Sequence, residues 1–250
     1  MPKRHVSNFI SFSTKKSREG GGENLLIAGF QKNSFVDYPG EICAVVFTPF
    51  CNFNCSYCHN AHILGNDAPL LDEEAIFDFL EKRRGLLRAV VVSGGEPTLQ
   101  QNLEPFIERV RSMGYLVKLD TNGSKPQVLQ SLLSKNMLDY VAMDIKAPLE
   151  KYSLIARSPV DSAAISRSIS LLESSGVNHE FRLTFAPQLT SEDALEAAQL
   201  VKGCERFYLQ QYRPRNESDP PAHSPAVVRE TAERIKSEIG VCLVRGIGPS

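Results

Sequence analysis

Short apolar segments alternate with amphipathic segments along most of this chain, at intervals of about 30 residues. The apolar segments are rich in β-branched residues and are bounded by Gly, Pro, Asn or charged residues, as β-strands are. The expected strands are Ile42–Thr48, Ala89–Ser93, Leu116–Thr121, Tyr140–Ile145, Glu180–Thr184 and Phe207–Gln211. The expected helices are Asp72–Lys82, Asn102–Met113, Gln127–Lys135, Ser162–Ser174 and Ser191–Lys202. Repeated β-α units predict an α/β fold with parallel strands and right-handed crossovers, either a barrel or an open doubly wound sheet.

The number of repeated units favours an incomplete barrel over a closed eight-stranded one. After the sixth unit we expect a polar, proline-broken loop at 213–221, a final helix at Ala226–Ile239 and a short strand at Val241–Val244. No second domain is evident, so residues 25–250 are predicted to form a single domain. Residues 1–24 are basic and serine-rich and have no apolar core of the kind that a secretory signal needs, which predicts a flexible N-terminal tail.

Composition narrows the class of protein. With 250 residues, 42% of them hydrophobic and 23% charged, the chain can bury a full core. Its formal net charge of −1 gives no basic field that would attract nucleic acid or an anionic membrane. No apolar run approaches the roughly 20 residues of a membrane helix. We therefore expect a cytoplasmic protein that binds neither nucleic acid nor membrane.

Three of the six cysteines lie close together, directly after the first expected strand. Cys51, Cys55 and Cys58 have C-x3-C-x2-C spacing, and thiolates are ligands for iron–sulfur clusters or zinc. A four-iron cluster normally has four cysteine ligands, so three would leave one iron open to another molecule. The alternative is a structural zinc site with His59 or a distant cysteine as fourth ligand, but the second C-x2-C pair usual in such sites is missing. The isolated Cys43, Cys204 and Cys242 are predicted to be buried small hydrophobic residues.

Polar residues follow the later strands, and in parallel α/β barrels ligands bind at the carboxyl ends of strands. Ser93-Gly94-Gly95-Glu96-Pro97 offers close backbone approach and a carboxylate, although a tight turn with a solvated acid would also explain it. Asp120-Thr121-Asn122-Gly123 has the pattern of an ordinary Asn-Gly turn. Asp144-Ile145-Lys146 ends an apolar strand with an acid and a base, which are either paired in a local salt bridge or bound to a ligand.

Taken in order, these motifs resemble the radical S-adenosylmethionine enzymes, whose signature is the cysteine triplet with an aromatic residue, here Tyr57, before its last cysteine. The resemblance implies a partial (β/α)6 barrel and a 4Fe-4S cluster whose open iron is chelated by the methionine part of S-adenosylmethionine. It also implies reductive cleavage of that cofactor to a 5′-deoxyadenosyl radical. Gly94, Gly95 and Glu96 would hold the cofactor's amino group.

A narrower resemblance points to the activases of glycyl radical enzymes. Tyr57-Cys58-His59-Asn60 is similar to their cysteine loop, where neighbouring backbone groups contact the adenine, and residues 29–40 look like the N-terminal segment of anaerobic ribonucleotide reductase activating proteins. By this resemblance Asp120, Thr121, Asp144, Ile145 and Lys146 line the ribose and carboxylate and help hold a monovalent cation. Arg182 resembles a further cofactor contact, or serves as a structural ion-pair partner. One departure is the sixth strand, which continues as Gln210-Gln211-Tyr212-Arg213-Pro214 where activases often have a histidine.

The implied function is generation of a glycyl radical on a partner enzyme, with the anaerobic ribonucleoside-triphosphate reductase as leading partner. The electron would come from an external donor such as flavodoxin or ferredoxin, because the chain has too few cysteines for an added ferredoxin insert. No general base is expected, since a hydrogen atom is abstracted. The alternatives are a small-molecule radical enzyme similar to 7-carboxy-7-deazaguanine synthase and a zinc-stabilised interaction module without catalysis.

Overall fold

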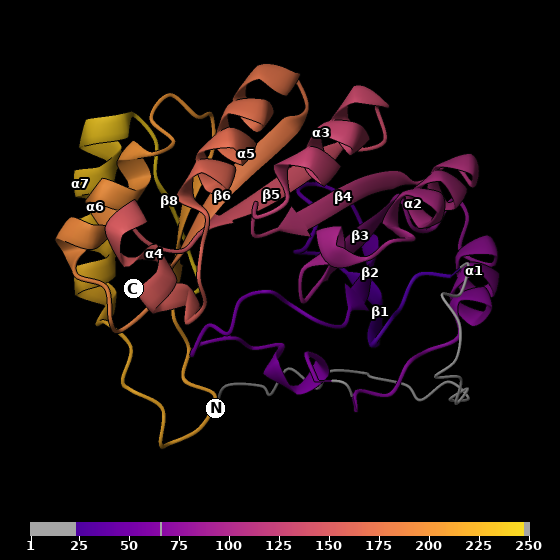
Figure 1. The fold of residues 1–250 in the computed structure, drawn as a ribbon, viewed down its shortest axis with the longest axis horizontal. Helices are drawn as coiled ribbons and strands as arrows, with labels where there is room; N and C mark the ends of the chain where they lie inside the picture. The colour runs from indigo at the N-terminus through magenta and orange to yellow at the C-terminus, as the bar shows by residue number, and fades with distance from the viewer. Residues whose placement is uncertain (1–23, 66, 248–250) are drawn as a thin grey trace. The chain divides into compact units, whose positions relative to one another are not determined.

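The computed structural model describes residues 24–65 and 67–247, which form two compact units (Figure 1). Of the described residues, unit 1 comprises 24–51, 60–65, 67–120 and 134–139. Unit 2 comprises 52–59, 121–133 and 140–247. The predicted N-terminal tail lies almost wholly outside the described residues, and the single-domain assignment of residues 25–250 stays a prediction.

Eight strands form one sheet in chain order, from β1 to β8. β1 is antiparallel to β2, and the later neighbours whose register is defined are parallel. The sheet is open among the described strands, with β1 and β8 as its two edges. This open, mostly parallel α/β sheet confirms the predicted fold class. The strands are β1 (Gly29–Ser34), β2 (Cys43–Thr48), β3 (Ala89–Gly94), β4 (Leu116–Thr121), β5 (Tyr140–Ile145), β6 (Asn178–Phe185), β7 (Phe207–Gln211) and β8 (Leu243–Arg245).

In unit 1 the buried strands β2 and β3 are covered by amphipathic helices. The valines of β3 have no exposed surface, as expected for a parallel strand that is buried on both faces. α1 (Glu73–Glu81) begins at Asp72, whose side chain accepts a hydrogen bond from the Glu74 amide, and buries an apolar stripe. α2 (Leu103–Ser112) buries a similar stripe. Two short 3-10 helices, η1 (Ala61–Ile63) and η2 (Pro97–Leu99), complete this unit.

Along the strands of unit 2, successive side chains point to opposite faces of the sheet. On β6 the side chains of Phe181, Leu183 and Phe185 are fully buried, whereas Glu180 and Arg182 point to the opposite face. α6 (Ser191–Gln199) carries a capping box made by Thr190 and Asp193 at its start. α6 and α7 pack together (Figure 1). The helices are α3 (Pro126–Ser134), α4 (Leu149–Ala156), α5 (Ser162–Ser175), α6 (Ser191–Gln199) and α7 (Pro225–Ile239).

The sequence prediction missed β1, α4 and the two 3-10 helices, and it misplaced β8. β1 was not predicted because the segment Gly29-Phe30-Gln31-Lys32-Asn33-Ser34 is mostly polar, which an antiparallel edge strand tolerates. α4 was missed because it is short and directly follows Pro148. The last strand begins at Leu243 rather than Val241, because Gly240 ends α7 in the left-handed conformation, with φ of 91°.

The isolated cysteines are buried, as predicted. Cys43, Cys204 and Cys242 have relative exposures of 0%, 8% and 9%, and burial raises the pKa of the Cys43 thiol to about 12. These thiols therefore behave as small hydrophobic residues. None of the described helices is long and apolar enough to cross a membrane.

Candidate active site

The residues singled out in the sequence are distributed over both units. Unit 1 contains Cys51, Gly94, Gly95, Glu96 and Asp120. Unit 2 contains Cys55, Tyr57, Cys58, His59, Thr121, Asp144, Ile145, Lys146 and Arg182.

In unit 1 the turn after β3 is joined by backbone hydrogen bonds to the segment that leads into Cys51. The amide of Gly95 donates to the Thr48 carbonyl, and the amide of Glu96 donates to the Phe50 carbonyl, both at 2.8 Å. A Cβ atom on Gly95 would lie 1.8 Å from the Phe50 carbonyl oxygen, and one on Gly94 would lie 2.4 Å from backbone atoms of Thr48. Both glycines are therefore required by close backbone packing, and Gly94 also has a φ of 115°.

The carboxylate of Glu96 is fully buried. Its Oε1 atom accepts hydrogen bonds from the amide and the hydroxyl of Thr98, at 3.1 and 2.5 Å, and thereby caps η2. The Asn60 side chain donates to the Gly94 carbonyl at 2.8 Å, which ties the end of the Tyr-Cys-His-Asn run to the same turn. The interpretation of Glu96 as a solvated acid is wrong, because the residue has no exposed surface. An acid buried in this way needs hydrogen-bond or charge partners.

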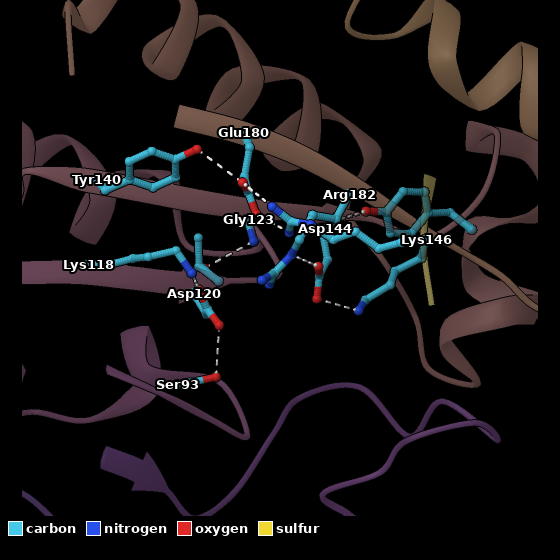
Figure 2. Close-up of polar contacts among 12 residues, drawn as sticks. Ser93, Lys118, Asp120, Gly123, Tyr140, Asp144, Lys146, Glu180 and Arg182 are labelled. Carbon is cyan, nitrogen blue, oxygen red and sulfur yellow. Dashed lines mark hydrogen bonds and ion pairs between the residues drawn. The ribbon is translucent and has the colours of Figure 1, made fainter. Parts of the chain in front are cut away.

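Asp120 lies in a partly buried polar cluster with Lys118 on β4 and Ser93 on β3 (Figure 2). Its Oδ1 atom is 2.5 Å from Nζ of Lys118, and its Oδ2 atom accepts a hydrogen bond from Ser93 at 3.1 Å. The Lys118 side chain is only 2% exposed. Lys118 was not predicted as a site residue, although its spacing of two residues from Asp120 on one strand places both side chains on one face.

In unit 2 Asp144 lies between two cations (Figure 2). Oδ1 accepts from Nε of Arg182 at 2.8 Å, and Oδ2 accepts from Nζ of Lys146 at 2.9 Å. Burial alone would raise the pKa of Asp144, but the charges of Arg182 and Lys146 outweigh it and lower the pKa to about 2. Burial opposes the charge of Lys146, yet Asp144 prevails and raises its pKa well above the ordinary value. The three groups therefore stay ionised together.

The second half of the cysteine loop adjoins this charged group. The charge of Lys146 acts on both Cys55 and Tyr57, although burial is the larger effect and raises the pKa of both side chains. The Tyr57 hydroxyl is buried and has no hydrogen-bond partner among the described residues. The loop is fixed to α4 by a 2.8 Å hydrogen bond from the Asn54 amide to the Ala156 carbonyl.

The turn after β4 also holds the cysteine loop. Asn122 donates to the side chain of Asn52 at 3.0 Å, and Asn52 donates to the Ser124 hydroxyl at 2.9 Å. Thr121 accepts from the Gly123 amide at 3.1 Å, and a Cβ atom on Gly123 would lie 2.1 Å from Cε of Met143. The Asn-Gly run is therefore a turn, as its pattern indicates, and it also positions the start of the cysteine loop.

Two predicted residues differ from the others in their surroundings. The Ile145 side chain has no exposed surface and belongs to the hydrophobic core. His59 is exposed, and its pKa is lowered first by partial burial and then by the charges of Arg215 and Arg213.

A second polar cluster was not predicted from the sequence. Its centre is Glu180, which is 1% exposed and accepts hydrogen bonds from Tyr140 at 3.0 Å and from Arg245 at 2.7 and 3.0 Å. Figure 2 shows Tyr140 and Glu180 next to each other.

The chemistry of the donor residues fits an iron–sulfur cluster. Three thiols within eight residues are available, and all three lie at partly exposed positions. Among the described residues, no three His, Cys, Asp or Glu side chains are already gathered as a metal site. Cys51 also belongs to a different unit from Cys55 and Cys58. The fit therefore rests on the soft thiolate donors and their spacing.

Comparison with known proteins identifies the family. The family profile described as "Radical SAM superfamily" matches residues 45–201 of this chain. The chain belongs to the radical SAM superfamily. The match confirms the predicted enzyme class and its two cofactors, a 4Fe-4S cluster and S-adenosylmethionine.

Relatives of known name agree with this assignment. A Methanocaldococcus jannaschii protein named "putative glycyl-radical enzyme activating enzyme" is 34% identical over 236 residues, which cover 89% of this chain and 96% of that protein. The 7-carboxy-7-deazaguanine synthase of Koribacter versatilis is 32% identical over 90 residues, 36% of this chain and 39% of the synthase. A structure of Streptococcus suis SuiB bound to S-adenosylmethionine shares the fold with a TM-score of 0.64 and 13% identity, over 79% of this chain and 48% of SuiB.

Proposed function

We propose that this radical SAM enzyme is an activase that generates a glycyl radical on a partner enzyme. The observation that carries the proposal is the similarity to the M. jannaschii protein, which extends over 96% of that protein and 89% of this chain. A similarity of this extent covers the N-terminal segment and the cysteine loop as well as the strands, so it is not limited to the superfamily's shared core. The order of motifs along the chain supports the same proposal.

Each predicted residue has a role in this proposal. Cys51, Cys55 and Cys58 would hold the cluster, which when bound supplies the electron for reductive cleavage of S-adenosylmethionine to a 5′-deoxyadenosyl radical. The remaining assignments concern the cofactor: Tyr57, Cys58 and His59 for the adenine, Gly94, Gly95 and Glu96 for the amino group, and Asp120, Thr121, Asp144, Ile145, Lys146 and Arg182 for the ribose, the carboxylate and a monovalent cation.

The protein's own part in the chemistry is to bind, orient and exclude water. Lys146 and Arg182 stay protonated beside Asp144, so they offer fixed positive charge to a carboxylate without a proton transfer. Glu96 is held in one orientation by Thr98, so its charge is preorganised for an ammonium group. The Tyr57 hydroxyl, buried without a partner among the described residues, is available to a bound ligand.

The partner is proposed to be an anaerobic ribonucleoside-triphosphate reductase, on the similarity of residues 29–40 to the N-terminal segment of its activating proteins. The electron donor is proposed to be a flavodoxin or ferredoxin. The test is to mix the reconstituted, reduced protein with S-adenosylmethionine and the reductase from the same genome, and to record the electron paramagnetic resonance spectrum. We expect a glycine-centred radical whose splitting collapses when the reductase carries deuterated glycine.

Two variants serve as matched controls for that experiment. Cys58→Ala removes a proposed cluster ligand and should give no radical, whereas Cys204→Ala removes a buried thiol and should give the full signal. A second candidate is a small-molecule enzyme, favoured by the similarity to 7-carboxy-7-deazaguanine synthase over 36% of this chain. If the wild-type protein forms 5′-deoxyadenosine with a purine or pterin substrate and radicalises no glycyl protein, the second candidate replaces the first.

A further inference from the structure

The loop between β7 and α7 contains a tightly folded turn at Arg215 and Asp219. The Asp219 carboxylate accepts hydrogen bonds from the Arg215 amide at 2.7 Å, from Nε at 3.1 Å and from a terminal guanidinium nitrogen at 3.1 Å. The side chain of Arg215 is 35% exposed and that of Asp219 is 12% exposed, so the pair lies at the surface of unit 2. One side of the guanidinium is therefore neutralised and held in a defined orientation.

The other side of the same guanidinium reaches the cysteine loop. Nη1 of Arg215 donates to the backbone carbonyl of Cys58 at 3.4 Å, across 157 residues of sequence. Both residues belong to unit 2, together with the whole turn. Arg215 thus brings a cation to the backbone of a cysteine that is proposed to bind the cluster.

We propose that Arg215 is a positioning residue for the cluster. Arg215 fixes the backbone at Cys58 and raises the reduction potential of the bound cluster. The proposal rests on the proposed function through the assignment of Cys58 as a ligand. Reduction adds one electron from the external donor to the cluster, so the reduced cluster is the more negative state. A nearby guanidinium stabilises that state more than the oxidised one, and cluster potentials depend on such charges and hydrogen bonds.

The Asp219 carboxylate acts in the opposite sense. It lies on the far side of the guanidinium from Cys58 and offsets part of the positive charge. Removing the arginine charge should therefore lower the potential, whereas removing the aspartate charge should raise it. A purely structural role for the pair predicts the same effect from both changes, because either one breaks the Arg215–Asp219 contact.

The experiment is a redox titration of the reconstituted full-length protein, followed by the electron paramagnetic resonance signal of the reduced cluster. In Arg215→Gln the ratio of oxidised to reduced cluster at the wild-type midpoint should rise about tenfold, which is about 59 mV for a one-electron couple. Asp219→Asn should shift the midpoint in the opposite direction. Iron content should equal that of the wild type in both variants, and Arg215→Lys, which keeps the charge, should remain closer to the wild-type midpoint.

The matched control is Arg234→Gln, which removes an arginine paired with Glu192 elsewhere on unit 2 and should leave the midpoint unchanged. Midpoints of Arg215→Gln and Arg234→Gln that coincide, or shifts of the same sign in Arg215→Gln and Asp219→Asn, would overturn the proposal while leaving the cluster assignment intact. A wild-type protein that binds no iron would overturn both this proposal and the proposed function.

Discussion

Arg182 and Asp144 are in register on neighbouring parallel strands, and Nε of the arginine donates to Oδ1 of the aspartate at 2.8 Å. The second carboxylate oxygen binds Lys146, so a single acid holds two cations on the same face of unit 2. Side chains of all three residues are less than one third exposed. Solvent therefore screens these charges only partly, and the group is electrostatically coupled.

Asp144→Asn should destabilise the protein by about 3 kcal/mol, because it leaves two poorly solvated cations without their counter-charge. Urea denaturation monitored by circular dichroism measures the change in the free energy of unfolding. The matched control is Glu192→Gln, which disrupts the exposed pair with Arg234 and should give no measurable change. Equal effects of the two substitutions would show that the Asp144 network contributes no more than a surface ion pair.

The stability that Asp144 contributes should depend on pH. Its folded-state pKa of about 2 lies below the value of about 3.9 in an unfolded chain, so the stabilisation is complete above the unfolded value. It should be lost as the pH falls from about 4 through about 2, because the acid is protonated in both states only below the folded-state pKa. The difference in unfolding free energy between wild-type apoprotein and Asp144→Asn should then shrink by about 2 kcal/mol. A difference that stays constant over this range would contradict the lowered pKa.

Gly95→Ala should destabilise unit 1 by about 3 kcal/mol, because the added Cβ would lie 1.8 Å from the Phe50 carbonyl oxygen and would push the segment before Cys51 away. Thermal unfolding and iron content after reconstitution measure the effect, and both should fall. Gly65→Ala is the control, since the nearest atom to its Cβ is 4.0 Å away. Normal iron binding in Gly95→Ala would mean that the turn after β3 does not position the cysteine loop.

Local patterns in the sequence were enough to predict two strands of unit 2, β5 and β7. β5 and β7 were predicted with their observed ends because each is an apolar, β-branched or aromatic run between clear boundaries. β1 could not be found in this way, since its residues are mostly polar and its pairing with β2 is a tertiary contact. The later start of β8 could not be predicted either, because it depends on the left-handed conformation of Gly240 at the end of α7.

The candidate site shows the same limit. Asp144 and Lys146 are two residues apart, so their pairing could be predicted from strand geometry. Arg182 lies 38 residues from Asp144 and Arg215 lies 157 residues from Cys58, and only the folded chain shows which partners they have. Lys118 was not predicted as a site residue, although its spacing of two residues from Asp120 places both side chains on one face of β4.

Glu96→Gln should separate the charge of this residue from its structural role. The amide keeps an oxygen that can accept from the Thr98 amide, so the fold should survive, but the charge available to an ammonium group is lost. Affinity for S-adenosylmethionine, measured by calorimetry, should fall about tenfold. Glu74→Gln is the control, because it removes an exposed carboxylate of the same unit, paired with Arg109, and should leave affinity unchanged. Unchanged binding in Glu96→Gln would refute the assignment of Glu96 to the cofactor.

Cysteine substitutions test the proposed cluster ligands most directly. Reconstituted wild-type protein should contain about four irons, and Cys51→Ala, Cys55→Ala or Cys58→Ala should each abolish the cluster, since three thiolates are the minimum set proposed. Iron content and the visible absorption of the anaerobic protein provide the measurement. Cys43→Ala, Cys204→Ala and Cys242→Ala should keep the full iron content, because these thiols are buried within apolar surroundings and burial keeps their pKa high. If Cys204→Ala lost its iron as completely as Cys55→Ala, the three-ligand assignment would fail.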